Sequence, residues 1–317
     1  MKNLLAVVLL ALSSAVSAQA YPSRPIKFVV PFAPGGGTDL VARIISVKMS
    51  ESMGQPVVIE NRGGAGGQIG TAFAAKSAPD GYTIVIGSTP LTIGHSLYKN
   101  LPYDLLRDFA PLSLVVKQPL TLLVASSAPA NSVKELIALA KAQSGKLNHA
   151  SGGNGTGTHL AAELFKSLAG VDIVHVPYNG QAAALNAALA GQVTVVFDQP
   201  GTSLGHVQAG KIKMLAVTSK ARSPQSPNTP TMEEAGVPGY EVDSWFGVFA
   251  PAGTPRDVIE RLSAEIAKSA KLPDVRDKLT AQGFVVVGST PAEFDAFVKA
   301  EVAKWKRVID VSGAKAD

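Results

Sequence analysis

Two glycine-rich segments carry the residue types best suited to binding a small anion. The first runs Pro34-Gly35-Gly36-Gly37-Thr38-Asp39, and the second runs Ser151-Gly152-Gly153-Asn154-Gly155-Thr156-Gly157-Thr158-His159. Glycine lacks a Cβ, so a glycine turn can bring backbone amides close to a ligand. Each segment precedes an amphipathic run, and a helix N-terminus offers unpaired N–H groups and a partial positive charge. The pattern predicts two anion-binding turns, with Thr38 or Asp39 capping the first helix and Gly54 ending it.

A third glycine loop, Arg62-Gly63-Gly64-Ala65-Gly66-Gly67, follows an apolar run at 57–60. Its glycines fit either a direct ligand contact or a turn that only permits close packing, and the sequence leaves both open. None of the three loops matches the nucleotide-binding patterns G-x-G-x-x-G or G-x-x-x-x-G-K-[ST]. We therefore expect no nucleotide and no other cofactor.

One segment matches a catalytic pattern. Gly201-Thr202-Ser203-Leu204-Gly205 fits the G-x-S-x-G nucleophile elbow of hydrolases. Such hydrolases need an acid and then a histidine after the serine, whereas His206, three residues on, is the last histidine of the chain. We interpret the match as fortuitous and keep a secreted serine hydrolase using Ser203 as the alternative hypothesis. The five histidines show no metal-binding spacing, so no metal site is predicted, and His159 fits either a donor to a ligand or a partly buried polar residue.

Short β-branched runs alternate with runs of helical periodicity, which is typical of βαβ units in a parallel sheet. Strands are predicted at 26–31, 57–60, 83–87, 147–150, 173–176, 193–197, 213–218, 245–250 and 284–287. Helices are predicted at 40–53, 68–77, 132–142, 159–169, 181–190, 255–271 and 291–310. Ligands bind at the carboxyl ends of parallel strands, so two facing domains would bring both glycine turns into one cleft.

A chain of 317 residues exceeds what one core usually accommodates, which predicts two domains. The extended stretches at 112–126 and 245–250 are interpreted as strands that cross between them. The first lobe is then discontinuous and comprises 21–118 and 249–317. The second lobe comprises 119–248.

The composition excludes several classes of protein. Hydrophobic residues make up 46% and charged residues 17%, as in a folded chain, and the absence of cysteine excludes disulfides and thiolate metal sites. Basic residues are dispersed and aromatic residues make up only 6%, so a nucleic-acid groove is not expected. Residues 1–20 combine Lys2, an apolar run at 4–12 and small residues at 13–20, which predicts an export signal cleaved near Ala18 to Ala20. The mature chain is expected outside the cytoplasm.

Eight stretches of the sequence resemble the substrate-binding proteins of tripartite tricarboxylate transporters, also called Bug proteins. They follow the family's order from Tyr21 to about Pro255 and read YPSRPIKFVVPFAPGGGTDLVAR, VVIENRGGAGGQIGT, APDGYTIVIGSTP, ASGGNGTGTHLAAELF, VDIVHVPYNG, GQVTVVFDQ, KMLAVTSKARSPQSPNTPTMEEAGVPGYEV and SWFGVFAPAGTP. The resemblance implies an α/β fold of the two-lobed, type II-like Venus flytrap class, with two parallel or mixed sheets flanked by helices and joined by crossing strands. It also implies a periplasmic, monomeric, non-enzymatic protein that closes on a small carboxylate and delivers it to a membrane permease.

The resemblance further implies a set of ligand-binding residues. In the family a ligand carboxylate is held by the first-strand loop and the matching second-lobe loop, through backbone amides, hydroxyls and ordered water. The corresponding residues here are Pro34, Gly35, Gly36, Gly37, Thr38 and Asp39 in the first lobe and Ser151, Gly152, Asn154, Gly155, Thr156, Thr158 and His159 in the second. The cleft wall would include Ser88, Thr89, Tyr178 and Asp198.

The chain also departs from the family pattern. Gly64 stands where a proline is common, which would change the rigidity of that loop. Asn179 and Gln181 replace a frequent lysine and a frequent glycine or serine, so the ligand preference near the second lobe is open. Asp39 and Asp198 fit either contacts with an amino group of a ligand or structural roles in a helix start and a turn.

Two further questions stay open at the level of sequence. No arginine or lysine lies inside the two main turns, so recognition is expected to rest on amide and hydroxyl donors and on helix ends. The ligand itself stays open among mono-, di- and tricarboxylates, amino acids and aromatic acids. The ligand-bound form either feeds a permease or is presented to a membrane sensor such as a sensor kinase.

Overall fold

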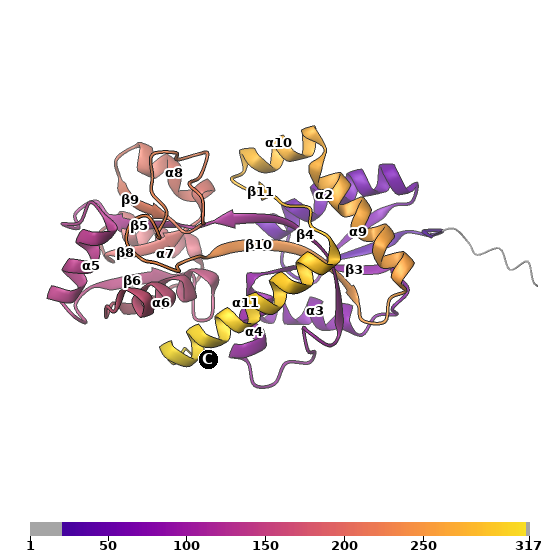
Figure 1. Cartoon of the computed structure of the whole chain (residues 1–317), viewed down its shortest axis with the longest axis horizontal. Helices are drawn as coiled ribbons and strands as arrows, with labels where there is room; N and C mark the ends of the chain where they lie inside the picture. Colours follow the sequence, from indigo (N-terminus) through magenta and orange to yellow (C-terminus); the bar gives the residue numbers. More distant parts are fainter. Residues whose placement is uncertain (1–20, 315–317) are drawn as a thin grey trace, which may run out of the picture.

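Two β-sheets, each covered by helices, form two lobes that lie side by side (Figure 1). The computed structural model describes residues 21–314, so the predicted export signal at 1–20 lies outside the described residues. The first sheet has the strand order β11-β4-β10-β3-β1-β2, and the second has the order β7-β6-β8-β5-β9. Both sheets are mixed, because β4, β10 and β11 are antiparallel neighbours in the first and β5 is antiparallel to β8 and β9 in the second. The predicted α/β class with two parallel or mixed sheets is confirmed.

The first lobe contains six strands. These are β1 (Ile26–Val30), β2 (Val57–Asn61), β3 (Thr83–Ser88), β4 (Phe109–Pro119), β10 (Asp243–Pro251) and β11 (Val285–Val286). The helices that accompany them are α2 (Gly37–Met53), the 3₁₀ helix η1 (Ala65–Gly67), α3 (Gln68–Ala75), α4 (Thr89–Leu97), α9 (Arg256–Lys271), α10 (Pro273–Ala281) and α11 (Pro291–Ser312).

The second lobe contains five strands. These are β5 (Thr121–Ala125), β6 (Asn148–Ser151), β7 (Val174–Pro177), β8 (Val195–Asp198) and β9 (Ile212–Val217). Its helices are α5 (Val133–Ala142), α6 (Gly157–Ala169), α7 (Gln181–Leu189) and α8 (Pro200–Gln208).

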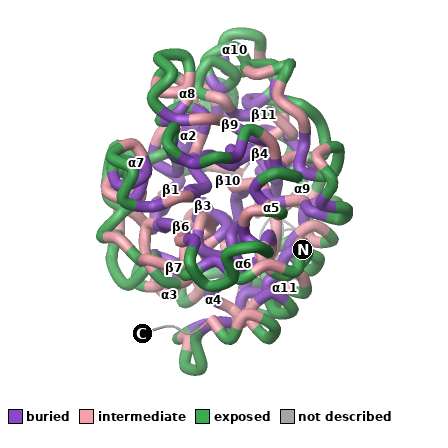
Figure 2. The backbone as a smooth tube through the Cα atoms, turned by 90° about the vertical axis from the view of Figure 1, so that its left-hand side faces the viewer, coloured by how far each residue is buried: buried purple, intermediate pink, exposed green. Residues whose placement is uncertain are grey.

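Helices on both faces of the first sheet explain why β1 is apolar except at Lys27, which is half-buried and pairs with Glu60. Ile26, Phe28 and Val30 pack into one cluster with α2 and α9, and Val29 packs into another with α3 and α11. Successive side chains of a strand point to opposite faces, so a strand buried on both faces is largely apolar. Figure 2 shows the buried residues along the interior strands and the exposed ones on outer helices and loops.

Two adjacent strands connect the lobes. Leu120 alone separates β4 from β5, so the chain passes from the first sheet into the second without a turn. β10 brings the chain back and pairs with β4 over its whole length, from Asp243 opposite Pro119 to Pro251 opposite Phe109. In Figure 1 this antiparallel pair runs between the two lobes.

The sheets divide the chain differently from the predicted lobe boundaries at two places. Residues 243–248, predicted in the second lobe, lie in β10 of the first sheet, because β10 pairs with β4 there. The last turns of α11, predicted in the first lobe, contribute Trp305 and Val308 to the core of the second. The same helix contributes Phe294 and Val298 to the first-lobe core, so α11 spans both lobes.

Three helices lie where no helix is predicted, namely α4, α8 and α10. Each is nine residues long, and α8 contains Gly201 and Gly205, which weaken its helical signal. No helix of the described residues is both long enough and apolar enough to cross a membrane.

Candidate functional site

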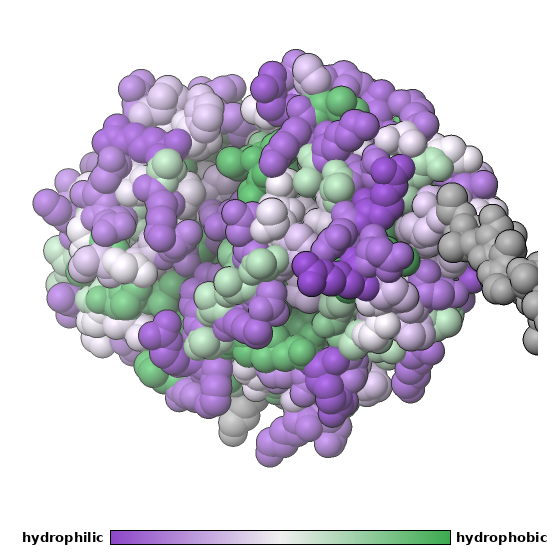
Figure 3. Space-filling model, turned by 45° about the vertical axis from the view of Figure 1, so that its right-hand side comes forward, coloured by the Kyte–Doolittle hydropathy of each residue, from purple (hydrophilic) through white to green (hydrophobic). Residues whose placement is uncertain are grey.

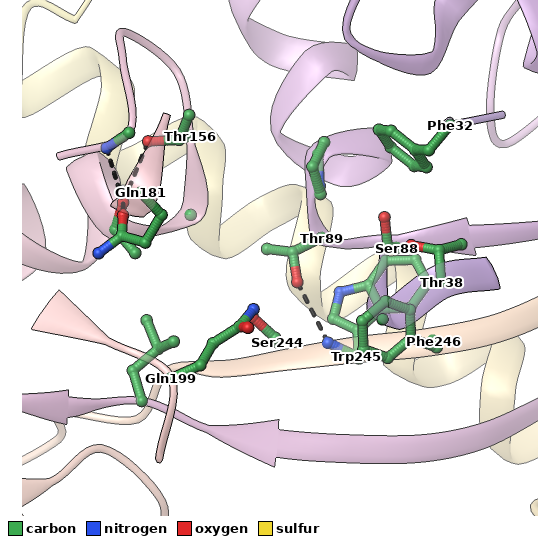
Figure 4. Close-up of a pocket in the computed structure, with 16 residues that line it drawn as sticks. Phe32, Thr38, Ser88, Thr89, Thr156, Gln181, Gln199, Ser244, Trp245 and Phe246 are labelled. Atoms are coloured by element: carbon green, nitrogen blue, oxygen red, sulfur yellow. Dashed lines mark hydrogen bonds between the residues drawn. The ribbon is translucent and has the colours of Figure 1, made fainter. Parts of the chain in front are cut away.

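A cleft of about 280 Å³ lies between the lobes, where strands of both sheets end (Figure 4). The first lobe lines it with Phe32, Gly37, Thr38, Ser88, Thr89 and Pro90, and the second with Gly152, Thr156, Gly157, Thr158, Gln181 and Gln199. The connecting strands add Leu120, Ser244, Trp245 and Phe246. None of these lining residues is charged.

Five helices begin at this cleft. Its lining includes N-cap or first-turn residues of α2 (Gly37, Thr38), α4 (Ser88, Thr89), α6 (Thr156, Gly157, Thr158), α7 (Gln181) and α8 (Gln199). Figure 4 shows Thr156 and Gln181 on one side and Thr38, Ser88 and Thr89 on the other. Each helix start carries unpaired N–H groups and a partial positive charge. The site therefore gathers positive potential without a cationic side chain.

The first glycine turn is held by Asp39. The N-cap of α2 is Gly36, so the predicted capping by Thr38 or Asp39 is wrong, although Gly54 does end the helix in a left-handed conformation. Asp39 instead reaches back from the first turn of the helix and accepts hydrogen bonds from Gly35 N (2.9 Å) and Arg43 Nε (2.8 Å).

The second oxygen of the Asp39 carboxylate is also occupied. Asp39 Oδ1 accepts a hydrogen bond from Asn61 Nδ2 (2.9 Å), and the side chain is almost fully buried. The hydrogen bond from Arg43, together with those from Gly35 and Asn61, lowers the pKa of Asp39 to about 2. Asp39 is thus an ionised anchor that ties the turn to β2.

The second glycine turn is fixed by a relay of side chains. Thr156 is the N-cap of α6 and accepts a hydrogen bond from His159 N (3.3 Å). Thr158 Oγ1 donates to Gln181 Oε1 (2.8 Å), and Gln181 Nε2 donates to the Phe197 carbonyl (2.8 Å). The relay sets the spacing of α6, α7 and β8 at the cleft wall.

Three histidines stack beneath this turn. The ring centroids of His159 and His175 are 3.9 Å apart, and those of His149 and His175 are 4.8 Å apart. His159 Nδ1 accepts a hydrogen bond from Gly155 N (3.1 Å), and His175 Nε2 shares a hydrogen bond of 2.7 Å with Ser151 Oγ. Burial lowers the pKa of His159 to about 4 and that of His175 to about 3, so both rings are neutral at pH 7. The rings support the turn from below.

Glu163 lies against the histidine stack. Its Oε1 is 3.4 Å from His149 Nε2 and 2.8 Å from Lys166 Nζ. Burial raises the pKa of Glu163, but the interactions with His149 and Lys166 outweigh it and bring that pKa to about 2. Because the rings stack face to face, their nitrogens do not converge, and no group of residues within 21–314 is arranged to hold a metal ion.

The predicted wall residues divide into two groups. Ser88 and Thr89 line the cleft, and Thr89 Oγ1 also accepts a hydrogen bond from Trp245 N (3.2 Å), which ties α4 to β10. Asp198 is fully buried, its Oδ2 accepts a hydrogen bond from Thr202 Oγ1 (2.6 Å), and burial raises its pKa. Tyr178 packs against the second-lobe cluster around α7. Asp198 and Tyr178 thus lie behind the wall.

The structure brings part of the predicted set together at the cleft. The predicted residues that line it are Gly37, Thr38, Ser88, Thr89, Gly152, Thr156 and Thr158. A neighbouring hollow of about 370 Å³ is lined by Gly35, Gly36 and Asp39 among others. The predicted residues outside both linings are Pro34, Ser151, Asn154, Gly155, His159, Tyr178 and Asp198.

Several lining residues escaped the sequence prediction. They are Phe32, Pro90, Leu120, Gly157, Gln181, Gln199, Ser244, Trp245 and Phe246. Gln181 and Gln199 follow strands β7 and β8 and start helices. The expectation that ligands bind at the carboxyl ends of strands, which located the glycine turns, would have located these two residues as well. The crossing-strand residues carry no such signal, because their exposure to the cleft depends on how the lobes face each other.

The other two motifs have structural roles. Ser203 is fully buried on α8, and its Oγ donates to the Gln199 carbonyl (2.9 Å) and shares a hydrogen bond with Thr121 Oγ1 (3.2 Å). The third glycine loop is absent from the lining of this cleft, and a Cβ at Gly67 would press against Phe32 at 3.1 Å. Close packing therefore accounts for a glycine at position 67.

Two α/β lobes joined by paired strands, with an uncharged cleft ringed by helix starts, define a solute-binding protein. Residues 41–314 match the family model described as tripartite tricarboxylate transporter family receptor. The chain belongs to this family, which confirms the resemblance in the sequence. It is a periplasmic substrate-binding protein and not an enzyme.

Similar proteins cover nearly the whole chain. It is 44% identical over 291 residues to the UPF0065 protein in the tcbD-tcbE intergenic region of Pseudomonas sp. (strain P51), which covers 92% of this chain and 87% of that protein. It is 39% identical over 322 residues to protein BugT of Bordetella pertussis, with 99% of each covered.

Solved structures have the same architecture. R. palustris Rpa4515 with adipate has 38% sequence identity and a TM-score of 0.79, covering 93% of this chain and 99% of that one. MatC of Rhodopseudomonas palustris with bound malate has 34% sequence identity and a TM-score of 0.76, covering 91% of this chain and 100% of that one.

Proposed function

We propose that the cleft captures a small organic carboxylate and that the protein delivers it to the membrane subunits of a tripartite tricarboxylate transporter. One observation carries the proposal: five helix N-termini meet at a cleft whose lining has no charged side chain. Anions are stabilised at helix starts by N–H donors and by the helix dipole. A cation would face the same dipoles and be disfavoured.

The donors and the apolar wall suit the two parts of such a ligand. Thr38 and Ser88 offer hydroxyls beside the backbone amides, and hydrogen bonds to an ionised carboxylate are stronger than neutral ones. Phe32 and Phe246 provide apolar surface for a short carbon skeleton. Closure of the lobes about β4 and β10 would exclude water and strengthen each contact.

The relatives support the ligand class. The structure of Rpa4515 holds adipate and that of MatC holds malate, both of which are carboxylates. We assign direct ligand contacts to Gly37, Thr38, Ser88, Thr89, Gly152, Thr156 and Thr158. The remaining predicted residues, Pro34, Gly35, Gly36, Asp39, Ser151, Asn154, Gly155, His159, Tyr178 and Asp198, would support these contacts from behind or from the neighbouring hollow.

A carboxylate panel tests the proposal. Thermal unfolding is measured with malate, succinate, adipate, aspartate and benzoate, and with the matching neutral amides as controls. A ligand at 100 times its Kd stabilises the folded state by about 2.7 kcal/mol, so a binder gives a clear rise in Tm. A rise with an acid and none with its amide is expected, and the absence of a shift with every acid in the panel contradicts the proposal.

A variant locates the binding in the cleft. Thr158→Val removes one cleft hydroxyl and its hydrogen bond to Gln181, which should weaken binding about fivefold, since one hydrogen bond contributes about 1 kcal/mol. Thr83→Val, at the amino end of β3 and so at the opposite end of that strand from Ser88 in the cleft, is the matched control and should bind like the wild type. Equal affinity in both variants would place the ligand elsewhere.

Export, oligomeric state and partner belong to the same proposal. We expect the mature chain to begin near residues 19–21, as N-terminal sequencing of periplasmic protein would show, and to be a monomer in size-exclusion chromatography with light scattering. Loss of carboxylate uptake on deletion of the permease genes, with uptake unchanged on deletion of a sensor kinase, would favour delivery over signalling.

A further inference from the structure

A second pocket, about 580 Å³ in volume, lies on the opposite face of the two connecting strands. Successive side chains of a strand point to opposite faces. On β10, Asp243 lines the second pocket while Ser244 lines the cleft, and on β4, Lys117 and Pro119 line the second pocket while Gln118 lines the hollow beside the cleft. Asp243 pairs with Pro119, and Ser244 with Gln118, so the alternation holds for these two pairs, whereas Trp245, opposite Lys117, also lines the cleft. We call this second space the hinge pocket.

Both lobes contribute walls to the hinge pocket. The second lobe provides residues 219–225, which follow β9, and the first lobe provides residues of α10 and residues 283–286 around β11. In Figure 1, α10 and β11 lie above the connecting strands and across from the second lobe. Figure 3 shows hydrophobic side chains in a hollow between the two halves of the molecule at about this height. The size of the pocket is within the range usual for small-molecule sites.

A buried carboxylate at the hinge pocket lacks a hydrogen-bond donor. The Asp243 side chain is 10% exposed, and within residues 21–314 its Oδ1 has no partner. Its Oδ2 lies 3.6 Å from Lys117 Nζ, which is longer than a hydrogen bond. Burial raises the pKa of Asp243 to about 6. Because a buried carboxylate without donors is costly, a bound group that donates hydrogen bonds would be stabilised here.

The outer wall of the hinge pocket has the opposite charge. Lys220, Arg222 and Arg276 line it and are largely exposed. Each has an acidic neighbour, but a guanidinium carries five N–H donors and keeps several of them free for a second acceptor. Phe284 and Pro224 add apolar surface to the lining, which also includes Lys117 beside Asp243 and Glu241 beside Lys220. The pocket therefore presents an acidic, an apolar and a basic region.

We propose that the hinge pocket binds an amino acid zwitterion with an apolar side chain. The ammonium group would donate hydrogen bonds to Asp243, the carboxylate would meet Arg222 and Arg276, and the side chain would pack on Phe284. A plain carboxylate lacks the donor that Asp243 needs, and a plain amine lacks the acceptor for the basic rim. The ligand of the hinge pocket thus differs in class from that of the cleft.

Occupancy of the hinge pocket is coupled to the cleft, and this part of the proposal rests on the proposed carboxylate binding. The pocket and the cleft exist together in one conformation and share the strand β10, which pairs with β4. A ligand that contacts both lobes favours the interlobe angle to which it binds best. The amino acid should therefore change the carboxylate affinity several-fold, and the carboxylate should change the amino acid affinity by the same factor.

Calorimetry with L-phenylalanine on the full mature protein tests the site. We expect saturable binding, with N-acetylphenylalanine, which lacks the ammonium, and 2-phenylethylamine, which lacks the carboxylate, at least tenfold weaker. Asp243→Asn should reduce phenylalanine binding at least tenfold, and Asp295→Asn, at an exposed position of α11, should leave it unchanged. A melting curve of Asp243→Asn verifies that the variant is folded. Arg276→Gln, a substitution at an exposed position, should also reduce phenylalanine binding.

The cleft variant separates the two sites. Thr158→Val should bind phenylalanine like the wild type, and a saturating carboxylate should not displace it. Competition with the carboxylate, or loss of phenylalanine binding in Thr158→Val, places the amino acid in the cleft and overturns the proposal. Undiminished binding in Asp243→Asn, or no binding by the wild type at millimolar phenylalanine, also overturns it. If phenylalanine binds but leaves carboxylate affinity unchanged, the coupling is refuted.

Discussion

Replacing Asp39 by asparagine tests whether this residue anchors the first glycine turn. The carboxylate accepts three hydrogen bonds, from Gly35, Arg43 and Asn61, and its pKa is lowered from 3.8 to about 2. One pKa unit corresponds to about 1.4 kcal/mol, so the ionised form adds on the order of 2 kcal/mol to the stability of the fold. Asparagine has the same shape as aspartate but carries no charge, and its NH₂ group would face one of these three hydrogen-bond donors.

The pH dependence has a definite sign. Because the pKa of Asp39 is lower in the folded chain than in the unfolded chain, its contribution is complete above about pH 4 and is lost as the pH falls through about 2. Urea unfolding should therefore show Asp39→Asn to be about 2 kcal/mol less stable than the wild type at pH 7. The difference between the two proteins should shrink toward zero in acid.

A second ion pair, exposed to solvent, shows how much stability the pairing alone contributes when the carboxylate is not buried. Asp295 and Lys299 form another pair four residues apart, with an oxygen to nitrogen distance of 2.7 Å, but both side chains are exposed. Such pairs contribute little, so Asp295→Asn should cost less than about 0.5 kcal/mol. An Asp39→Asn variant as stable as the wild type at pH 7, or a difference that persists unchanged in acid, would refute the reasoning.

Binding assays on the same variant resolve the open role of Asp39. If Asp39 only anchors the turn, Asp39→Asn should lower the affinities for malate and aspartate by similar factors. If Asp39 contacts an amino group, the loss should be confined to aspartate.

Three further outcomes follow from the structure. Tm should fall as the pH drops from about 6.5 to about 4, because His159 and His175 bind protons at a higher pH in the unfolded chain than in the folded chain. In differential scanning fluorimetry, His175→Asn should flatten this dependence of Tm on pH. A variant with the same pH profile as the wild type would contradict the prediction. Trp305→Ala should lower the free energy of unfolding in urea by about 3 to 5 kcal/mol, because Trp305 is fully buried in the second-lobe core. Val311→Ala, on the exposed side of α11, should lower it by less than about 0.5 kcal/mol. Equal losses in the two variants would argue that α11 does not bridge the two lobes. Ser203→Ala should leave carboxylate affinity within about twofold and remove no hydrolytic rate, because Ser203 is buried and bonded to Gln199; loss of a measurable esterase rate would revive the hydrolase hypothesis.

The sequence by itself determined the local elements and the chemistry of the two turns. Alternating apolar runs predicted most strands and helices, because burial on one or both faces imposes a period on the chain. The glycine segments predicted helix starts with exposed amides, since these are local consequences of backbone freedom. The absence of arginine and lysine from the turns likewise indicated recognition by amides and hydroxyls.

Tertiary structure alone decided which residues face the cleft. His159, Ser151 and Asp39 resemble ligand contacts in the sequence, yet their polar atoms bond to Gly155, to the histidine stack and to Arg43. Gln199, which follows β8 of the second sheet, and Phe246, on β10 of the first, line the same cleft only because the two lobes lie side by side. Local pattern fixes where a strand or helix begins, but the direction of a side chain relative to the other lobe depends on long-range packing, such as that of Trp305 from α11 in the second-lobe core.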